Sequence, residues 1–198
     1  GKEGVPDPND EDWWQYRRDQ ITKTVERIYS TMTSIDPEAQ LLAYPIGRFN
    51  DAVNFNYQDW PTWLENGVID GVLTQIYTGS NADFIARATE QIGAYDGERL
   101  IGVAVDAFRS DVDLEGQIEI SRQMGFDGSS PFHHSSVGPL GYTDDLKAAY
   151  DGIAAWPEMP WKTDPIICAG VDIIAGDEDD VLTGTACDEL IVGGLGSD

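Results

Sequence analysis

The sequence predicts an α/β fold of about four strand–helix units, equivalent to the C-terminal half of a TIM (β/α)8 barrel, followed by a short repeat tail. Two observations predict this fold class. Strand and helix patterns alternate four times before residue 152, and the connections have the helical length that parallel strands require. From Ala175 to Asp198 the pattern changes to a nine-residue register.

The first predicted element is a long helix from Trp14 to Ile35. Its apolar residues recur every three or four positions, which is the spacing of one helix face. Asp36-Pro37 ends the pattern, because a residue before proline is pushed out of the α region. The apolar positions are Ile21, Val25, Ile28, Met32 and Ile35.

The remaining elements alternate between short apolar runs and amphipathic segments. Leu100–Asp106 is almost entirely apolar, as expected of a strand covered on both faces. Gly125–Phe132 contains a weaker strand pattern. The other predicted strands are Leu41–Pro45 and Val72–Tyr77, and the helices are Asp59–Glu65, Asn81–Ile92, Leu114–Met124 and a last one from Thr143 to about Gly152.

Two architectures fit this alternation: half of a (β/α)8 barrel, or a small doubly wound sheet. A complete barrel needs about 250 residues, so residues 1–152 have room for half of one. Residues 153–174, rich in proline and tryptophan, are predicted to be a linker. Residues 175–198 form the repeat tail.

The tail reads AGDEDDVLT, GTACDELIV and GGLGSD, with small residues in the first column and Asp180, Glu189 and Asp198 in the sixth. This pattern is typical of a parallel β-roll, in which small residues allow tight turns and carboxylates bind calcium. It resembles the RTX repeats of secreted Gram-negative proteins. Since it stops in mid-repeat, we expect a truncated tail that binds calcium weakly. The predicted ligands are Gly176, Asp180, Glu189, Gly194, Gly196 and Asp198.

The chain is strongly acidic, with a formal charge of −24. This charge argues against a nucleic-acid partner, because phosphates require a basic surface. It suits calcium binding and a secreted, extracellular location, although a merely soluble acidic surface is an alternative. No apolar run reaches 18 residues, so no membrane span is predicted.

Chemically useful side chains follow the predicted strands, where the catalytic residues of barrels lie. These side chains are Tyr44, Arg48, Gln75, Tyr77, Asp106, Arg109 and His133. Phosphate-binding, dinucleotide-binding and nucleophile-elbow motifs are missing from the sequence. Aromatic rings with convergent polar groups suit a sugar, whose ring face stacks while its hydroxyls accept and donate hydrogen bonds.

A resemblance sharpens this interpretation. Trp14…Arg17-Arg18, Tyr44-Pro45-Ile46-Gly47, Trp60…Trp63…Gly67-Val68-Ile69-Asp70 and Gln75-Ile76-Tyr77 occur in that order. The series is similar to the bacterial glycosyl hydrolase-like 10 family, over roughly residues 13–134. The resemblance implies that these strands are the fifth to eighth of a TIM barrel whose first half precedes Gly1. It also implies hydrolysis of a bacterial glycan, such as peptidoglycan or an exopolysaccharide.

Asp106 is the predicted catalytic residue, since it is the one carboxylate at the end of a well-defined buried strand. Glycoside hydrolysis usually needs two carboxyls, about 5–9.5 Å apart, as acid and as base or nucleophile. An alternative role for Asp106 is an N-cap or a salt bridge to Arg109 or Arg99. The predicted substrate-binding residues are Tyr44, Arg48, Gln75, Tyr77 and His133; alternatively, Arg48 pairs with Asp51.

Three functions are compatible with these features. The first is a glycoside hydrolase with a calcium-binding tail, of which this chain is an inactive fragment that folds marginally or self-associates. The second is a non-catalytic carbohydrate-binding or adhesive protein. The third is a complete doubly wound domain that binds a small ligand. The resemblance favours the first.

Overall fold

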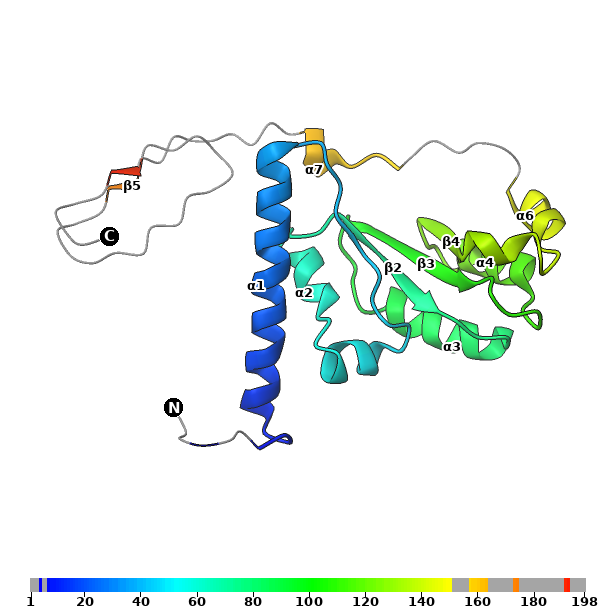
Figure 1. Ribbon diagram of the computed structural model, residues 1–198, viewed down its shortest axis with the longest axis horizontal. Coiled ribbons are helices and arrows are strands. Elements are labelled where there is room, and N and C mark those ends of the chain that lie inside the picture. The colour runs from blue at the N-terminus through cyan, green and yellow to red at the C-terminus, as the bar shows by residue number, and fades with distance from the viewer. Residues whose placement is uncertain (1–3, 5–6, 151–156, 164–172, 175–190, 193–198) are drawn as a thin grey trace. The chain divides into compact units, whose positions relative to one another are not determined.

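The structure is a computed structural model that describes residues 4, 7–150, 157–163, 173–174 and 191–192. Its main sheet has four parallel strands in the order β1-β2-β3-β4. Figure 1 labels β2, β3 and β4 of this sheet. The strands are β1 (Leu42–Ala43), β2 (Gly71–Ile76), β3 (Leu100–Asp106) and β4 (Gly128–Phe132). The predicted α/β fold is therefore confirmed.

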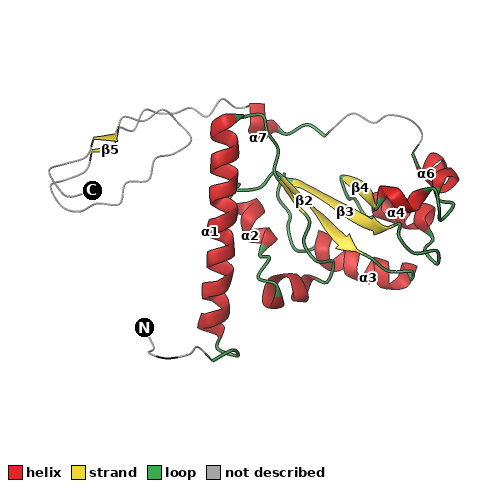
Figure 2. Cartoon of the chain, in the orientation of Figure 1, coloured by secondary structure: helices red, strands yellow, loops and turns green. Residues whose placement is uncertain are grey.

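The helices connect these strands in the predicted alternation (Figure 2). α3 and β3 have the predicted bounds, and the other predicted elements shift by a few residues. The π-helical segment η1 and the short helix α5 have no counterpart in the prediction. The bounds are α1 (Glu11–Ile35), η1 (Asp51–Phe55), α2 (Trp60–Glu65), α3 (Asn81–Ile92), α4 (Leu114–Gln123), α5 (His134–Val137) and α6 (Thr143–Ala149).

The helices after β2 and β3 cover one face of the sheet. α3 packs on β2, α4 packs on β3 and β4, and the two helices pack on each other. Along β2 the residues Val72, Thr74 and Ile76 are fully buried on this face, whereas Leu73 and Gln75 are partly exposed on the other. A doubly wound sheet places helices on both faces, so this arrangement is that of successive units of a barrel.

The core lies between this face and the helices. Trp60, Phe84, Leu114 and Ile118 are buried there against the apolar residues of β2 and β3. Trp60 and Trp63 belong to this core, as three-residue spacing on a helix indicates. The carboxylate of Asp70 accepts a hydrogen bond from Leu41 N at 2.7 Å, and that of Asp127 accepts one from Ile101 N at 2.7 Å. These bonds fix the amino ends of the strands.

The long helix α1 forms as predicted, but much of its apolar stripe is exposed. Val25 packs against the core, whereas Ile21, Ile28 and Ile35 are exposed, Ile35 to 81%. Near its start, Arg17 donates a 2.6 Å hydrogen bond to the Tyr57 hydroxyl, and its guanidinium lies 3.9 Å from the centre of that ring. No described helix is long and apolar enough to span a bilayer.

The chain divides into two compact units, residues 1–26 with 40–157 and residues 27–39 with 158–198. The second contains α7 (Pro160–Thr163), where Lys162 donates to the carbonyl of Ala39 at 2.5 Å. It also contains β5 (Ile173–Ile174) and β6 (Ile191–Val192), which pair in parallel. The predicted calcium ligands, Gly176, Asp180, Glu189, Gly194, Gly196 and Asp198, lie outside the described residues.

Candidate active site at the carboxyl edge of the sheet

The carboxyl ends of the four strands meet at one edge, because the strands are parallel and in sequential order. Asp106 pairs in register with Phe132, and Gln75 bridges to Ile46 beyond the end of β1. The predicted site residues that follow the strands are therefore brought to the same edge.

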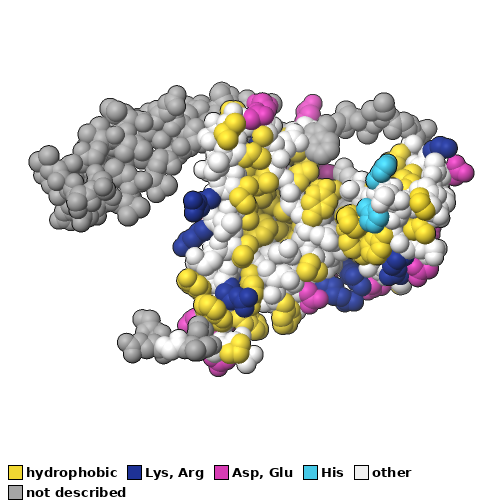
Figure 3. All heavy atoms as spheres, viewed as in Figure 1, with side chains coloured by type: hydrophobic (Ala, Val, Ile, Leu, Met, Phe, Trp, Pro, Cys, Tyr) yellow, Lys and Arg dark blue, Asp and Glu magenta, His cyan; other side chains and the backbone are white. Residues whose placement is uncertain are grey.

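An aromatic cluster of Tyr77, Phe108, Phe132 and His133 covers the ends of β2, β3 and β4. The Tyr77 ring stacks on Phe132 with centroids 5.4 Å apart and meets Phe108 edge-on at 5.5 Å. The His133 ring lies parallel to Phe108 at 6.3 Å. Phe108 is 40% exposed and Phe132 48% exposed, so the cluster presents ring surface to solvent. Figure 3 shows hydrophobic side chains beside the two histidines on this face.

Next to the aromatic cluster lies a cavity of about 240 Å³ at the ends of β1 and β2. It brings together three predicted residues, Arg48, Gln75 and Tyr77. It also contains Arg87 from α3, which the sequence prediction missed. The lining residues are Ile46, Gly47, Arg48, Gln75, Tyr77 and Arg87.

Tyr44 lies at the edge, but not in the cavity lining. Its side chain is 48% exposed, and its backbone carbonyl accepts a 2.6 Å hydrogen bond from Gln75 Nε2. The Gln75 side chain is thus oriented by the end of β1. The predicted alternation is confirmed, since Ile76 is buried on the helix side while Gln75 and Tyr77 line the cavity.

Asp106 is fully buried at the end of β3. Its Oδ1 accepts a 3.2 Å hydrogen bond from Phe108 N, and its Oδ2 lies 3.5 Å from Arg109 Nε. No hydrogen bond reaches Oδ2 from the described residues. The salt bridge from Asp106 to Arg109, which the sequence offered as an alternative role, is therefore present. Arg99, the other arginine considered, lies 3.6 Å from Asp70 instead.

The buried carboxylate influences Tyr77. The pKa of Tyr77 is raised to about 12, mainly by burial and to a smaller extent by the charges of Asp106 and Tyr44. Tyr77 therefore keeps its proton at neutral pH and is a hydrogen-bond donor beside the cavity.

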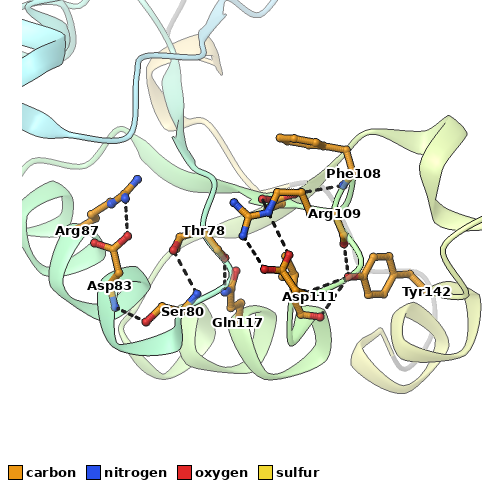
Figure 4. A network of polar contacts seen from close by, with 11 residues as sticks. Thr78, Ser80, Asp83, Arg87, Phe108, Arg109, Asp111, Gln117 and Tyr142 are labelled. Atoms are coloured by element: carbon orange, nitrogen blue, oxygen red, sulfur yellow. Dashed lines mark hydrogen bonds and ion pairs between the residues drawn. The ribbon is translucent and has the colours of Figure 1, made fainter.

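The loop after β3 is fixed by Arg109 and Tyr142 (Figure 4). Arg109 binds Asp111 through two hydrogen bonds, of 3.1 and 3.0 Å, and this pairing holds the pKa of Asp111 below its usual value. The Tyr142 hydroxyl donates a hydrogen bond to the Arg109 carbonyl. Because both ends of this loop are fastened, Phe108 and Asp106 are held in place.

Two buried glutamines fasten the other loops of the edge. Gln117 on α4 donates a 2.8 Å hydrogen bond to the Thr78 carbonyl, and Gln91 on α3 donates one of 3.1 Å to the Gly47 carbonyl. Ser80 caps α3 by accepting from Asp83 N, and its own amide donates to the Thr78 hydroxyl (Figure 4). The loops that carry Arg48 and Tyr77 are thereby positioned from the helix layer.

His133 belongs to the aromatic cluster and precedes α5. Its Nδ1 lies 2.8 Å from the Ser135 hydroxyl, which fixes the ring against Phe108. Among the described residues, no group of three or more His, Cys, Asp or Glu side chains is arranged to hold a metal ion.

The model of the glycosyl hydrolase-like 10 family matches residues 1–109, which is more than half of the chain. The chain belongs to the glycosyl hydrolase-like 10 family. Searches of curated proteins and of solved structures found no match. The matched region of this glycosyl hydrolase-like 10 member ends just beyond Asp106 and includes the whole cavity lining.

Several residues that carried the family resemblance have structural roles. Arg17 binds Tyr57, and Arg18 lies 3.3 Å from the Asn54 side chain, so the paired arginines dock α1 on the segment around η1. Trp63 donates to the Thr22 hydroxyl at 2.9 Å. Of these motifs, Ile46 and Gly47 together with Gln75 and Tyr77 line the cavity of the glycosyl hydrolase-like 10 domain.

Proposed function

We propose that this protein hydrolyses glycosidic bonds of a bacterial glycan, of peptidoglycan type or an exopolysaccharide. Family membership supports a glycosyl hydrolase-like function. The observation that carries the proposal is the partly exposed aromatic cluster directly beside the cavity of Arg48, Gln75 and Tyr77. Stacking rings next to polar donors suit a sugar chain.

In this proposal each residue has a distinct task. The rings of Phe108 and Phe132 stack on the apolar faces of sugars, and His133 extends that surface. Gln75 and Tyr77 hydrogen-bond to hydroxyls. Asp106 supplies one of the two carboxyl groups that glycoside hydrolysis requires.

The test compares two matched substitutions, one at the carboxyl end of β3 and one at the residue just before β4. Asp106→Asn removes the proposed catalytic carboxylate, and Asp127→Asn changes a carboxylate that only holds the amino end of the strand. Release of reducing ends from denuded peptidoglycan strands and from soluble β-glucans is measured on the full-length protein. We expect Asp106→Asn to lower kcat by about 10²–10⁴-fold, the usual contribution of an acid or base, with glycan binding retained. Equal cleavage by both variants would remove Asp106 from the mechanism.

A second candidate is a non-catalytic carbohydrate-binding or adhesive protein. The complete burial of Asp106, with its contacts to Phe108 N and Arg109, favours this reading, because a catalytic carboxyl must reach the glycosidic oxygen or the anomeric carbon. Glycan binding by the wild-type protein without release of reducing ends from any substrate would support this second function over the first.

We further propose that the tail binds calcium through Gly176, Asp180, Glu189, Gly194, Gly196 and Asp198. The donors would be carboxylate and backbone carbonyl oxygens, which are the ligands that calcium prefers. The pairing of β5 with β6 gives support, because Ile173 and Ile191 are two nine-residue periods apart. Parallel pairing of segments at this spacing is what successive turns of a β-roll require.

Calorimetric titration of the full chain with calcium tests the tail. We expect Asp180→Asn combined with Asp198→Asn to lower calcium affinity at least tenfold, with Asp144→Asn on α6 as the exposed control. Equal affinity of the two variants would refute the ligand assignment.

The proposed location is extracellular, of the secreted Gram-negative type, where calcium is abundant enough for weak sites. Fractionation of the native host would show the protein in the medium. Recovery in the cell extract alone would contradict secretion.

A further inference from the structure

The cavity at the ends of β1 and β2 contains two arginines in a chain whose formal charge is −24. Arg48 comes from the loop after β1, and Arg87 comes from the middle of α3. Two guanidinium groups on one cavity wall repel each other unless a negative charge lies between or opposite them. The nearby carboxylates therefore decide what the cavity can bind.

The carboxylate of Asp83 interacts electrostatically with both arginines. Arg87 forms an ion pair with Asp83, one turn earlier on α3 (Figure 4). The hydrogen bond from Arg87, with smaller contributions that include the charge of Arg48, holds the pKa of Asp83 below its usual value. In the described part of the chain, Arg48 makes no ion pair, so the alternative pairing with Asp51 is not observed. The group of Arg48, Arg87 and Asp83 thus carries one positive charge in excess.

The cavity also offers hydrogen-bond donors without partners. Arg87 Nε is shielded from solvent and has no partner among the described residues. The Tyr77 hydroxyl remains protonated at neutral pH, because its pKa is raised to about 12. Guanidinium and phenol donors converging on one cavity are complementary to an oxyanion.

The size and position of the cavity fit a substituent on a sugar rather than a whole ligand. Its volume of about 240 Å³ lies below the usual range of about 300–1,000 Å³ for drug-sized ligands. Tyr77 lines the cavity and also stacks on Phe132 in the aromatic cluster. A sugar ring stacked on the cluster would therefore place a side group into the cavity.

We propose that this cavity is an anion subsite, in which Arg48, Arg87 and Tyr77 bind a carboxylate or sulfate group carried by one residue of the glycan. The inference rests on the proposed glycan-binding function and narrows it to acidic glycans. Because Arg48 is exposed, salt weakens the interaction through screening.

The experiment measures calorimetric affinity of the full chain for three probes. The first two are denuded peptidoglycan strands and the same strands with their carboxyl groups reduced to alcohols. The third is an oligosaccharide of uncharged sugars that carries a sulfate group. The variants are Arg48→Gln and Arg87→Gln, with Arg27→Gln on the exposed surface of α1 as control. Arg48→Gln breaks no ion pair among the described residues, so it separates binding from folding.

We expect native strands to bind at least tenfold more tightly than reduced strands, with the preference lost in both cavity variants and kept in Arg27→Gln. Tight binding of the sulfated probe instead would identify sulfate as the anion. Equal affinity for native and reduced strands without tight binding of the sulfated probe, no binding of any probe, or a preference unchanged in both cavity variants, would overturn the proposal. A charge preference in this chain, together with no release of reducing ends by the full-length protein, would contradict the hydrolase proposal and leave the anion subsite standing.

Discussion

Gly47 is the position at which the cavity is most sensitive to a single added carbon atom. A Cβ at Gly47 would lie 1.8 Å from the Gln75 carbonyl oxygen and 2.5 Å from its carbon. Both atoms belong to the backbone of β2, so no side chain can move aside. The Gly47 loop must therefore move by on the order of 1 Å, because close-packed interiors resist such overlap.

The cost of Gly47→Ala follows from two contributions. Overpacking costs about 1–3 kcal/mol. The buried hydrogen bond from Gln91 to the Gly47 carbonyl is worth about 1 kcal/mol if the shift breaks it. We expect a loss of about 2–4 kcal/mol, and each kcal/mol lowers the Tm of a chain of this size by about 2–4 °C.

Urea denaturation and thermal melting of the full chain measure this loss, with Gly128→Ala as the matched control. A Cβ at Gly128 meets no atom within 4 Å, so we expect the control to stay within about 0.5 kcal/mol of wild type. If Gly47→Ala were as stable as Gly128→Ala, the described packing of the cavity loop on β2 would be wrong.

Three further predictions concern pH, loop anchoring and the aromatic rings. Folding raises the pKa of Tyr77 from 10.0 to about 12, so Tyr77 leaves the folding stability unchanged below pH 10 and lowers it as the pH rises from 10 to 12. The urea midpoint of Tyr77→Phe should therefore fall less over this range than that of the wild type, and identical pH profiles of the two proteins would refute this role of Tyr77. Gln117→Leu should lower the free energy of unfolding by about 1–2 kcal/mol, because it removes the buried hydrogen bond to the Thr78 carbonyl, whereas Gln123→Leu at an exposed position should change it little. Equal unfolding free energies of the two variants would contradict the anchoring role of Gln117. Phe84→Ala should cost about 3–5 kcal/mol, whereas Phe132→Ala should spare stability and weaken glycan binding. Comparable melting of these two variants would be inconsistent with the described core.

The main elements could be predicted because their signals are local. The apolar run of β3 and the helical spacing of α3 predicted both elements with their observed bounds. The alternation around Ile76 correctly predicted that Gln75 and Tyr77 face away from the helices. The exposure of Ile28 could not be predicted, since periodicity identifies an apolar stripe but not what covers it.

Much of the candidate site depends on contacts between distant residues. Arg87 lies 39 positions after Arg48 and enters the cavity because α3 packs on β2. Its pairing with Asp83 was visible as a four-residue spacing, but that spacing is common on helix surfaces. Likewise, Gln91 and Gln117 read as ordinary helix residues, and their burial against loop carbonyls appears only in the fold. The burial of Asp106 beneath Phe108 and Arg109 depends on the loop conformation.

We expect a glycan to bind at the carboxyl edge of the sheet. A crystal structure of the full chain with denuded peptidoglycan oligosaccharide tests it most directly. We predict sugar rings on Phe108 and Phe132 and a sugar substituent in the cavity of Arg48 and Arg87. Oligosaccharide bound instead at the opposite end of the strands, in the cavity of about 120 Å³ beside Leu42, Leu73, Leu100 and Pro157, would contradict the account.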